Sequence, residues 1–442
     1  MKWIIFFTAL LIGVPVGIVL SDRYRKFEYF VLFLIVFFTA QNIDINFVSR
    51  EWIRGTSRGF SIGLIDLATM IFFALVIKRK NHHKIKIIPP GTVLYFLYFF
   101  FSAISIFNSA NALMSFFELW NIFRMYLFYW VMYNYLRNYK NLSLIMKFIS
   151  VVVLFISFTV IKQKYLGGLY RPPGPFPHPN SLVMYLNIFN TLVFAYLLNV
   201  KSSNIFYWLT VFALGSFSLV STLSRAGMAV YFIAVAIILL LSYCQGFSTK
   251  KLIVTTLMVL VGTFGLIMVM DTLIERFVNA PERSGETRVE LALAAKKMAN
   301  DKLFGIGLNN FGIKIKPPYE YNSHMEYDRD NPEDSSNLIL VETVYMMIAA
   351  ETGWHNLIIF LLFLGQFYII NLGNLGRYKK SVYSYLPIGL LGGLTAIYLE
   401  STLEWVLKQT NNSYQLMLVF AIIGMMARKY KRKQLIQKVR QK

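Results

Sequence analysis

Cysteine and charged residues are scarce in this sequence. One residue of the 442 is a cysteine, Cys244, so neither a disulfide within the chain nor a cysteine-ligated metal cluster can form. Charged residues make up 15% of the sequence, whereas a typical soluble domain has about a quarter. This low charge, together with 56% apolar residues, predicts a chain that lies mainly in lipid.

The apolar residues are gathered into long runs that are free of charge, such as Leu252–Met270. A helix needs roughly 20 apolar residues to span the hydrocarbon layer, where every backbone amide must be paired internally. We therefore predict an all-α polytopic membrane protein with about 12–13 transmembrane helices. We expect the first helix to be retained rather than removed as a signal peptide. The expected spans are 3–20, 27–41, 60–78, 92–107, 115–135, 145–162, 181–200, 204–222, 226–243, 252–270, 354–372, 384–401 and 413–427.

The basic residues behind the net charge of +22 lie mainly in the loops between the spans. This distribution indicates membrane topology and does not indicate a nucleic-acid partner. Lysine and arginine cluster around residues 23–26, 78–86, 137–140, 250–251 and 377–380, and in the tail 428–442. The positive-inside rule places these segments, and hence the C-terminus, in the cytoplasm. We therefore expect a multi-pass membrane protein whose segments 42–59, 163–180, 271–353 and 402–412 lie on the opposite side of the membrane.

Residues 271–353 form the one large polar loop. Its part from Asp271 to Ser336 holds 12 of the 22 acids and 9 of the 44 bases, a net charge of 9 − 12 = −3. A segment of this length is too long for a plain connection, so we predict a small folded unit. A capping box at Thr287–Glu290 predicts a helix to about residue 300, with Val289, Leu291, Leu293 and Met298 available for burial, and a second helix is expected over 336–350.

The sequence suggests three parts. Residues 1–162 would form N-terminal transmembrane helices, residues 163–372 a core that includes the loop 271–353, and residues 373–442 the last spans with a basic tail. The polar residues with functional potential lie mainly in the second part, and most are arginines.

Arginine on the outer side of the membrane departs from the topology rule, so each instance calls for a reason. Arg171, Arg225 and Arg288 are such residues, and a guanidinium binds phosphate oxygens in a two-pronged geometry. Arg288 also lies in the first turn of a predicted helix, where unpaired amides favour an anion. The alternatives are a surface pair of Arg288 with a glutamate, and contact with lipid phosphates for Arg50, Arg54 and Arg58.

Motifs for other chemistries are missing. The sequence contains no phosphate-binding P-loop, paired-histidine zinc helix or nucleophile elbow. The pair Asp328-Arg-Asp330 has the spacing of metal-dependent sugar transferases, but it lies in an acidic run that we interpret as a solvated loop. We expect neither a metal nor a cofactor.

Four ordered motifs resemble those of the O-antigen ligase and O-antigen polymerase superfamily. Arg171–Asn180 is similar to its outer loop Arg-x-x-Gly-x-Phe-x-x-Pro-Asn, and Thr222–Gly227 resembles its Ser-Arg-Gly signature. Arg288 followed by Gly305–Phe311 is similar to its arginine helix and Gly-x-Gly-x-x-x-Phe turn. Val341–Gly353 resembles the closing segment that ends in Ala-Glu-Thr-Gly.

The resemblance implies a C-type glycosyltransferase fold and a metal-independent inverting transferase on the periplasmic face. Such an enzyme moves a glycan from an undecaprenyl-diphosphate carrier to a hydroxyl of a lipid A core, a growing glycan or another acceptor. By this likeness Arg225 and Arg288 would bind the diphosphate, and Arg171, Lys164 and Asn180 would assist near the carrier. Ligase and polymerase share these motifs, so either activity is implied.

One position departs from the family pattern, which has a His-Asn pair before its tyrosine with the histidine as the proposed base. Here Glu342-Thr343 stands in that place, with Tyr345 two residues further on. A partly buried carboxylate can also take a proton from a hydroxyl, so Glu342 is one candidate base. The alternatives are His324, or Glu342 as a mere partner for an arginine. A polytopic transporter or flippase for lipid-linked glycans is the rival that uses no catalysis.

Overall fold

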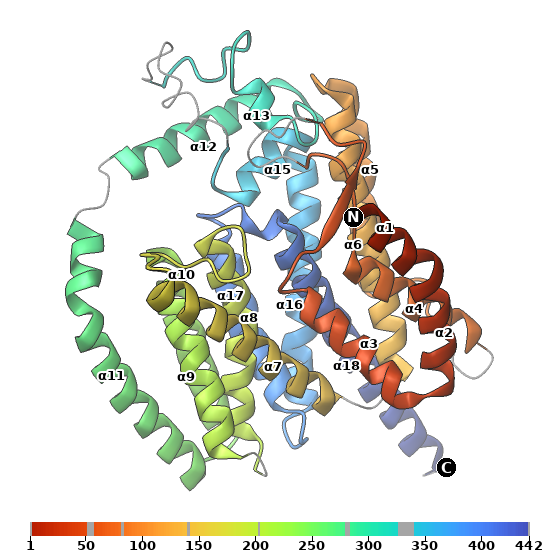
Figure 1. The fold of residues 1–442 in the computed structure, drawn as a ribbon, viewed down its shortest axis with the longest axis vertical. Coiled ribbons are helices and arrows are strands. Elements are labelled where there is room, and N and C mark those ends of the chain that lie inside the picture. The colour runs from red at the N-terminus through yellow and green to blue at the C-terminus, as the bar shows by residue number, and fades with distance from the viewer. Residues whose placement is uncertain are drawn as a thin grey trace. The chain divides into compact units, whose positions relative to one another are not determined.

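A computed structural model describes residues 2–50, 57–80, 84–138, 142–201, 204–278, 283–325 and 340–440. Helices account for most of these residues, and each expected span lies mainly on a helix (Figure 1). Within the described residues, five helical stretches are both long and apolar enough to cross a membrane: Trp3–Arg23, Leu142–Leu166, Pro179–Asn199, Arg225–Cys244 and Trp354–Arg377. Thr92–Asn108, Ile205–Ser221 and Tyr385–Glu400 are shorter apolar helices. The helical membrane class is thus confirmed, while the count of 12–13 spans stays a prediction.

The chain divides into two compact units, and each is built from discontinuous segments. The first comprises Met1–Lys140, Gly285–Phe367 and Ser401–Met425, and the second comprises Asn141–Ser284, Tyr368–Glu400 and Met426–Lys442. The first unit holds α1 (Lys2–Thr8), η1 (Ala9–Gly13), α2 (Val14–Arg23), α3 (Arg25–Phe38), β1 (Asp44–Phe47), β2 (Phe60–Gly63), α4 (Leu64–Lys78), α5 (Thr92–Ile104), η2 (Ser105–Asn108), α6 (Ala112–Asn138), most of α12 (Arg283–Asp301), α13 (Phe311–Lys314), α15 (Val344–Thr352) and η4 (Val406–Lys408).

The second unit holds the remaining helices, which lie mostly between residues 141 and 284. They are α7 (Leu142–Ile161), η3 (Lys162–Leu166), α8 (Pro179–Asn199), α9 (Ile205–Ser221), α10 (Arg225–Cys244), α11 (Thr249–Val278) and α17 (Tyr385–Glu400). Two long helices, α16 (Trp354–Arg377) and α18 (Thr410–Arg440), contribute residues to both units. Helix α11 continues to Val278, so the first residues of the predicted polar loop prolong the preceding helix, and the bounds of that loop stay a prediction.

A short antiparallel hairpin of β1 and β2 departs from the all-helical expectation. Asp44 pairs with Gly63 and Phe47 with Phe60, and the Asp66 carboxylate accepts a hydrogen bond from the Gly63 amide at 2.7 Å as α4 begins. The ring of Phe47 contacts those of Trp3 and Phe6, with centroids 5.0 and 5.5 Å away. The beginning of α1 therefore lies at the same end of the first unit as the hairpin.

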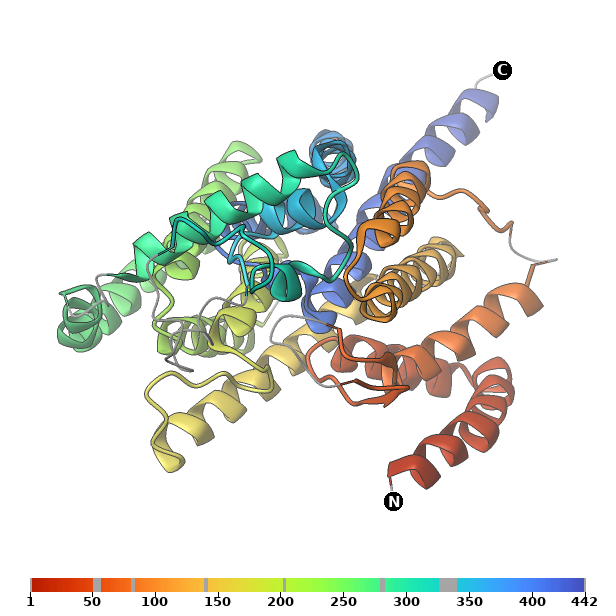
Figure 2. The same cartoon turned by 90° about the horizontal axis from the view of Figure 1, so that it is seen from above.

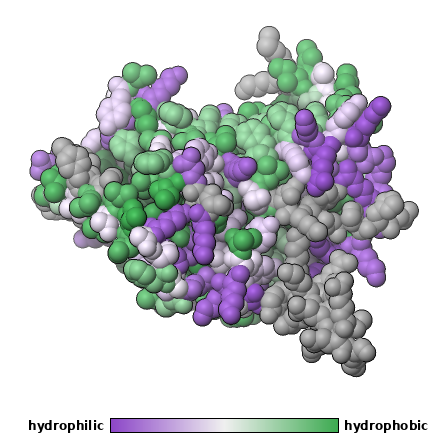
Figure 3. Space-filling model, turned by 90° about the horizontal axis from the view of Figure 1, so that it is seen from below, coloured by the Kyte–Doolittle hydropathy of each residue, from purple (hydrophilic) through white to green (hydrophobic). Residues whose placement is uncertain are grey.

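The opposite end of α2 and α4 is closed by Arg79. Its Nε donates to Asp22 at 3.2 Å, its Nη1 to Glu28 at 3.1 Å and its Nη2 to the Ser21 carbonyl at 3.2 Å. Seen from below, the surface shows clusters of hydrophilic side chains between hydrophobic areas (Figure 3). Arg79 belongs to one of the basic segments that the topology rule assigns to the cytoplasm.

The polar loop contains a folded subdomain, as its length predicts. Its core comprises Leu291, Ala294, Ala295, Met298, Ile306, Phe311, Ile315, Met325, Leu340, Val341, Met347 and Ala350. In Figures 1 and 2, α12 lies crosswise to α5 and α6 of the same unit. Leu291 and Met298 are buried as expected, but Val289 and Leu293 are exposed because they lie on the other face of α12. The Asp328–Asp330 pair lies outside the described residues.

Both helix boundaries in the subdomain differ from the prediction. Helix α12 begins at Arg283, so the Thr287–Glu290 box lies inside the helix and is not its N-cap. The second helix, α15, begins at Val344 rather than near 336, since residues 340–343 are non-helical. That shift leaves Glu342 in the non-helical segment that leads into α15.

Two glycines allow the turn after α12 to pass close to other backbone segments. The amides of Ile306 and Gly307 donate to the carbonyls of Ala350 and Glu351 at 2.9 and 3.0 Å, so the turn pairs with the end of α15. Gly305 has φ +69°, and a Cβ there would lie 2.4 Å from the Glu351 carbonyl carbon. A Cβ at Gly307, with φ +111°, would lie 2.5 Å from the Ser109 Cα. Both positions require glycine for conformation and for space.

The core of the second unit is a tight packing of α8, α10 and α17. Cβ atoms at Gly389 and Gly393 would lie 2.9 and 3.0 Å from the Cα atoms of Leu192 and Ile188, so α17 meets α8 with almost no side chain between them. Helices that pack in lipid use small residues for such close approach. This contact holds α8 buried along nearly its whole length.

We predict that Gly305→Ala unfolds the loop subdomain, because backbone atoms that cannot move aside occupy the space a Cβ needs. The expected destabilisation is about 3 kcal/mol. Thermal unfolding of the detergent-purified protein measures it. Gly365→Ala is the matched control, since a Cβ there meets nothing within 4 Å. Equal melting temperatures of the two variants would contradict the proposed packing.

Candidate functional site

Arg288 lies on α12 and is paired with two carboxylates of its own unit. Its Nε donates to Glu342, and its Nη2 lies 3.4 Å from Glu404 Oε1. The side chains of Arg288 and Glu342 are 35% and 40% exposed, whereas that of Glu404 is 7% exposed. Glu404 therefore holds the guanidinium on its buried side, while the Arg288–Glu342 pair faces an accessible surface. The sequence predicted Arg288 and Glu342 as site residues, and the structure brings them into direct contact.

The segment around Glu342 is fixed by its neighbours. Thr343 Oγ1 donates to the Ser401 carbonyl at 3.4 Å, which joins the approach to α15 to residues 401–404. Burial raises the pKa of Tyr345 to about 12, and a side-chain hydrogen bond with Ser401 only partly offsets this. Tyr345 thus stays a neutral hydroxyl at physiological pH, able to donate but not to serve as a base.

Both ring nitrogens of His324 are occupied in the same unit. Lys297 Nζ lies 3.0 Å from Nδ1, and Nε2 lies 3.0 Å from the Glu290 carbonyl oxygen. Because an ammonium can only donate, Nδ1 accepts and Nε2 carries the proton that it donates to the carbonyl. In this arrangement His324 has no free lone pair for an acceptor hydroxyl. Glu342 is the better-placed of the two candidate bases.

Arg171 organises the proline-rich loop of the second unit. Its Nε donates to the Thr222 carbonyl at 2.8 Å, and its Nη2 donates to Asn180 Oδ1 at 3.1 Å. Asn180 is the second residue of α8, whose N-cap His178 accepts from the Asn180 amide at 3.2 Å. The predicted residues Arg171 and Asn180 are thus in contact. Part of the Arg171 guanidinium is committed to holding the loop against the segment that precedes α10.

Gln163 closes the base of the same loop. Its Nε2 donates to the Gly174 carbonyl at 2.8 Å, and its Oε1 accepts from the Gly174 amide at 2.7 Å. Lys164 follows on the π-helical turn η3 and is half-buried, and it makes no hydrogen bond or ion pair with the other described residues. Lys164 therefore stays a candidate on its sequence position alone.

Arg225 is the first residue of α10, directly after a strained turn. Leu223 has φ +53°, a left-handed conformation that is unusual for leucine and reverses the chain before Arg225. Strain of this kind marks places where the surrounding structure dictates the backbone. Arg225 is half-buried, and the turn fixes where its side chain leaves the helix.

Glu400, at the end of α17, is a buried acid beside the same motif. Its Oε2 accepts from Asn187 Nδ2 at 2.8 Å, and a Cβ at Gly227 would lie 3.1 Å from its Oε1. The Ser-Arg-Ala-Gly motif thus packs against a carboxylate that sequence reasoning missed. The only signal was an acid at the end of an apolar run, and nothing in the sequence indicated which helix it faces.

A buried ion cluster supports the Arg288 site within the first unit. Lys408 Nζ lies 2.9 Å from Glu351 Oε2 and 3.6 Å from Glu118 Oε1, and the three side chains are 12%, 4% and 10% exposed. Burial disfavours the charge on Lys408, but the carboxylates of Glu351 and Glu118 outweigh it and raise the pKa of the ammonium above its ordinary value. The lysine therefore stays charged at every physiological pH.

The predicted site residues form two sets, one in each unit. Arg288, Glu342 and His324 belong to the first unit, and His324 bonds to Lys297 and Glu290 rather than to that pair. Arg171, Asn180, Arg225 and Lys164 belong to the second unit. Among the described residues, no group of three or more His, Cys, Asp or Glu side chains could hold a metal ion.

Apolar helices of spanning length and a polar subdomain with an arginine–carboxylate site define a helical integral membrane protein. Residues 210–361 match the family model described as O-antigen ligase, so the expected resemblance to this superfamily is confirmed over that segment. The segment includes Arg225, Arg288 and Glu342. The family acts as ligases or polymerases of cell-surface polysaccharide biosynthesis and consists of membrane glycosyltransferase-like enzymes. No curated protein matches the sequence.

We predict that Lys408→Met destabilises the protein by roughly 3–5 kcal/mol, because two carboxylates would be left buried without their cation. Thermal unfolding in detergent is the measurement. Lys302→Met removes an exposed lysine instead and should change stability by less than about 0.5 kcal/mol. If both variants unfold alike, the ion cluster does not contribute to stability.

Proposed function

We propose that the protein transfers a glycan from an undecaprenyl-diphosphate carrier to an acceptor hydroxyl on the periplasmic face of the bacterial inner membrane. The observation that carries the proposal is Arg288, which lies inside the segment that matches O-antigen ligases, is about one-third exposed and is paired with Glu342 and Glu404. A polymerase of the same superfamily would use the same residues. Lysine and arginine bias supports a periplasmic loop and a cytoplasmic C-terminal tail.

Arg288 would stabilise the leaving diphosphate. As the bond between the sugar and the diphosphate breaks, negative charge grows on the phosphate oxygens, and a positioned guanidinium lowers the energy of that transition state. Glu404 keeps Arg288 in place from its buried side and leaves the guanidinium with donors for a two-pronged contact. No metal is required for this step, because the charge compensation comes from arginine.

Glu342 would activate the acceptor, and its pairing with Arg288 suggests how. In the structure Glu342 accepts from Arg288, and an incoming diphosphate competes for the same donors. When the guanidinium turns to phosphate, the carboxylate is released to accept the proton of the attacking hydroxyl. The hydroxyl oxygen then bonds to the anomeric carbon with inversion, while the diphosphate leaves with the bonding electrons.

Arg225 of the second unit would bind phosphate of the carrier. Arg225 lies at the first turn of α10, where backbone amides add to its positive charge. Arg171 keeps its loop closed through Thr222 and Asn180, so we assign it and Asn180 a positioning role that shapes the surface near Lys164. The partners implied are the lipid-linked glycan, its hydroxyl acceptor and membrane lipids.

One observation favours the rival, a transporter of lipid-linked glycans. Arg124 on α6 is 4% exposed and pairs with Asp66 at 3.1 Å, while its Nε and Nη2 have no hydrogen-bond partner among the described residues. Buried charges inside spans are typical of transport pathways. Product formed by the purified protein in detergent, without a closed compartment, excludes transport as its sole activity.

Arg288→Gln should lower the rate of glycan transfer by about 100-fold to 1000-fold, because charge stabilisation of the leaving group is lost. The assay is transfer from a purified lipid-linked glycan, with insertion checked by membrane fractionation. Lys296→Gln, which removes an exposed charge of the same helix, is the matched control and should retain full activity. Full activity of Arg288→Gln would remove this residue from the site.

Substitutions of the two carboxylates beside Arg288 should show which one acts as the base and which one holds Arg288 in place. Glu342→Gln should lower turnover by about 100-fold or more with little change in melting temperature, since the side chain is 40% exposed. Glu404→Gln should lower the melting temperature and weaken donor binding, because it loosens Arg288. Unchanged turnover of Glu342→Gln across pH would show that Glu342 is not the base.

A further inference from the structure

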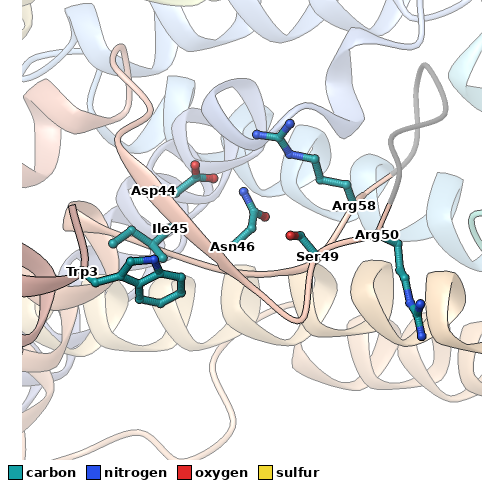
Figure 4. A pocket seen from close by; sticks show the side chains of 7 residues that line it. All are labelled: Trp3, Asp44, Ile45, Asn46, Ser49, Arg50 and Arg58. Atoms are coloured by element: carbon teal, nitrogen blue, oxygen red, sulfur yellow. The ribbon is translucent and has the colours of Figure 1, made fainter. Parts of the chain in front are cut away.

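A cavity of about 360 Å³ lies beside the β1–β2 hairpin within the first unit. It is lined by Trp3, Asp44, Ile45, Asn46, Ser49, Arg50 and Arg58 (Figure 4). Trp3 comes from α1, and the other six residues come from the hairpin and the segments that continue it. The volume falls at the lower end of the range for small-molecule sites.

Most polar side chains around this cavity are uncommitted. Among the described residues, the side chains of Asn46, Ser49, Arg50 and Arg58 have no hydrogen-bond or ion-pair partner. Nearby side chains of the same hairpin differ: Ser57 Oγ donates to Glu118, and Ser61 Oγ donates to Asn121 at 3.3 Å. Polar groups that serve structure are therefore satisfied here, whereas those facing the cavity keep their hydrogen-bonding capacity for a ligand.

The lining combines an aromatic face with amide, hydroxyl, carboxylate and guanidinium groups. The Trp3 ring is held edge-to-face by Phe47, yet 47% of the residue stays exposed. A flat ring of this kind offers an apolar surface for the C–H face of a sugar, while Asn46, Ser49 and Asp44 can exchange hydrogen bonds with hydroxyls. In Figure 4 the guanidinium of Arg58 extends on the side of Asn46 and Asp44.

We propose that this cavity binds a sugar residue that carries a carboxylate. Arg58 donates two parallel hydrogen bonds to the carboxylate, Trp3 stacks on the sugar ring, and Asn46 and Ser49 bind its hydroxyls. Two guanidiniums against one carboxylate, Asp44, give the lining a net positive charge that favours an acidic over a neutral sugar. The inference rests on the proposed function, since it adds a second glycan contact to the same protein.

The cavity is rigidly joined to the loop subdomain. The Ser57 amide donates to Asn309 Oδ1 at 3.1 Å, and Asn309 Nδ2 donates to the Ser57 carbonyl at 3.1 Å. Ser57 precedes Arg58, and Asn309 lies in the Gly305–Phe311 turn. The Arg50 amide also donates to the Arg58 carbonyl at 2.8 Å, which joins the backbone at these two arginines. A glycan held here is therefore fixed relative to the subdomain that carries Arg288.

Contact with lipid phosphates is the competing explanation for Arg50 and Arg58. Lipid phosphates would require the cationic groups alone. The structure adds a concave lining with an exposed indole, an amide and a hydroxyl, which can contact a sugar ring and its hydroxyls. These additional groups favour a sugar ring as the occupant.

The test is binding of trigalacturonate to the full-length protein in nanodiscs, measured by calorimetry. Galactotriose, which has the same ring without carboxylates, should bind at least about tenfold more weakly. Arg58→Gln should weaken trigalacturonate binding by about tenfold, and Asn46→Ala should weaken it to a lesser extent. Arg23→Gln, which removes an exposed arginine at the other end of α2, is the matched control and should bind as the unaltered protein does.

The outcomes separate this proposal from the proposed transfer. If trigalacturonate binds no better than galactotriose, or if Arg58→Gln and Arg23→Gln bind it equally, the proposal is overturned even when glycan transfer is active. If Arg58→Gln loses only bound anionic lipid, detected by native mass spectrometry, the lipid explanation holds instead. Selective binding that is lost in Arg58→Gln but kept in Arg288→Gln supports the cavity, whether or not transfer is observed.

Discussion

The ion cluster of Lys408, Glu351 and Glu118 is the constraint on which the first unit depends. It joins α6, the end of α15 and η4, three segments that are far apart in the chain. A charged group buried this deeply is tolerable only with its counter-charges in place. Glu404, which pairs with Arg288, lies just before η4 in the chain. The ion cluster therefore helps to fix the position of Glu404.

Glu351 explains the structural role of the closing motif Val341–Gly353. Its Oε1 accepts from the Phe311 amide at 3.4 Å, and its Oε2 accepts from Lys408 at 2.9 Å. The closing motif and the glycine turn are therefore two halves of one contact, completed by the hydrogen bonds from Ile306 and Gly307 to α15. We infer that both motifs serve to hold the subdomain together.

The sequence predicted the helices well, because a run of apolar residues in lipid has almost no alternative to a helix. It also predicted that Arg288 and Glu342 belong together, through their order in the motifs. It did not indicate Glu404, Glu400 or Lys408, since single charges in apolar stretches carry no information about their partners. The start of α15 was misjudged for a related reason: Leu340 and Val341 are buried in the subdomain core without being helical.

His324 and the β1–β2 hairpin show a further limit of sequence reasoning. His324 is a candidate because of its residue type. Its partners, Lys297 and the Glu290 carbonyl, lie on α12, and no sequence pattern indicates that this helix faces His324. The hairpin has strands of four residues each, too short for an alternating pattern to stand out from an apolar background.

The glycine of the Ser-Arg-Ala-Gly motif has a consequence for how this protein can vary. A Cβ at Gly227 would lie 2.1 Å from Val183 Cγ1, so the distance between α8 and α10 is set by the sum of two side-chain volumes. Alanine therefore fits at position 227 only if Val183 is replaced with a smaller residue. Positions 183 and 227 should therefore change together during divergence, a coupling of volumes between two helices that concerns the spacing of the membrane core and not phosphate recognition.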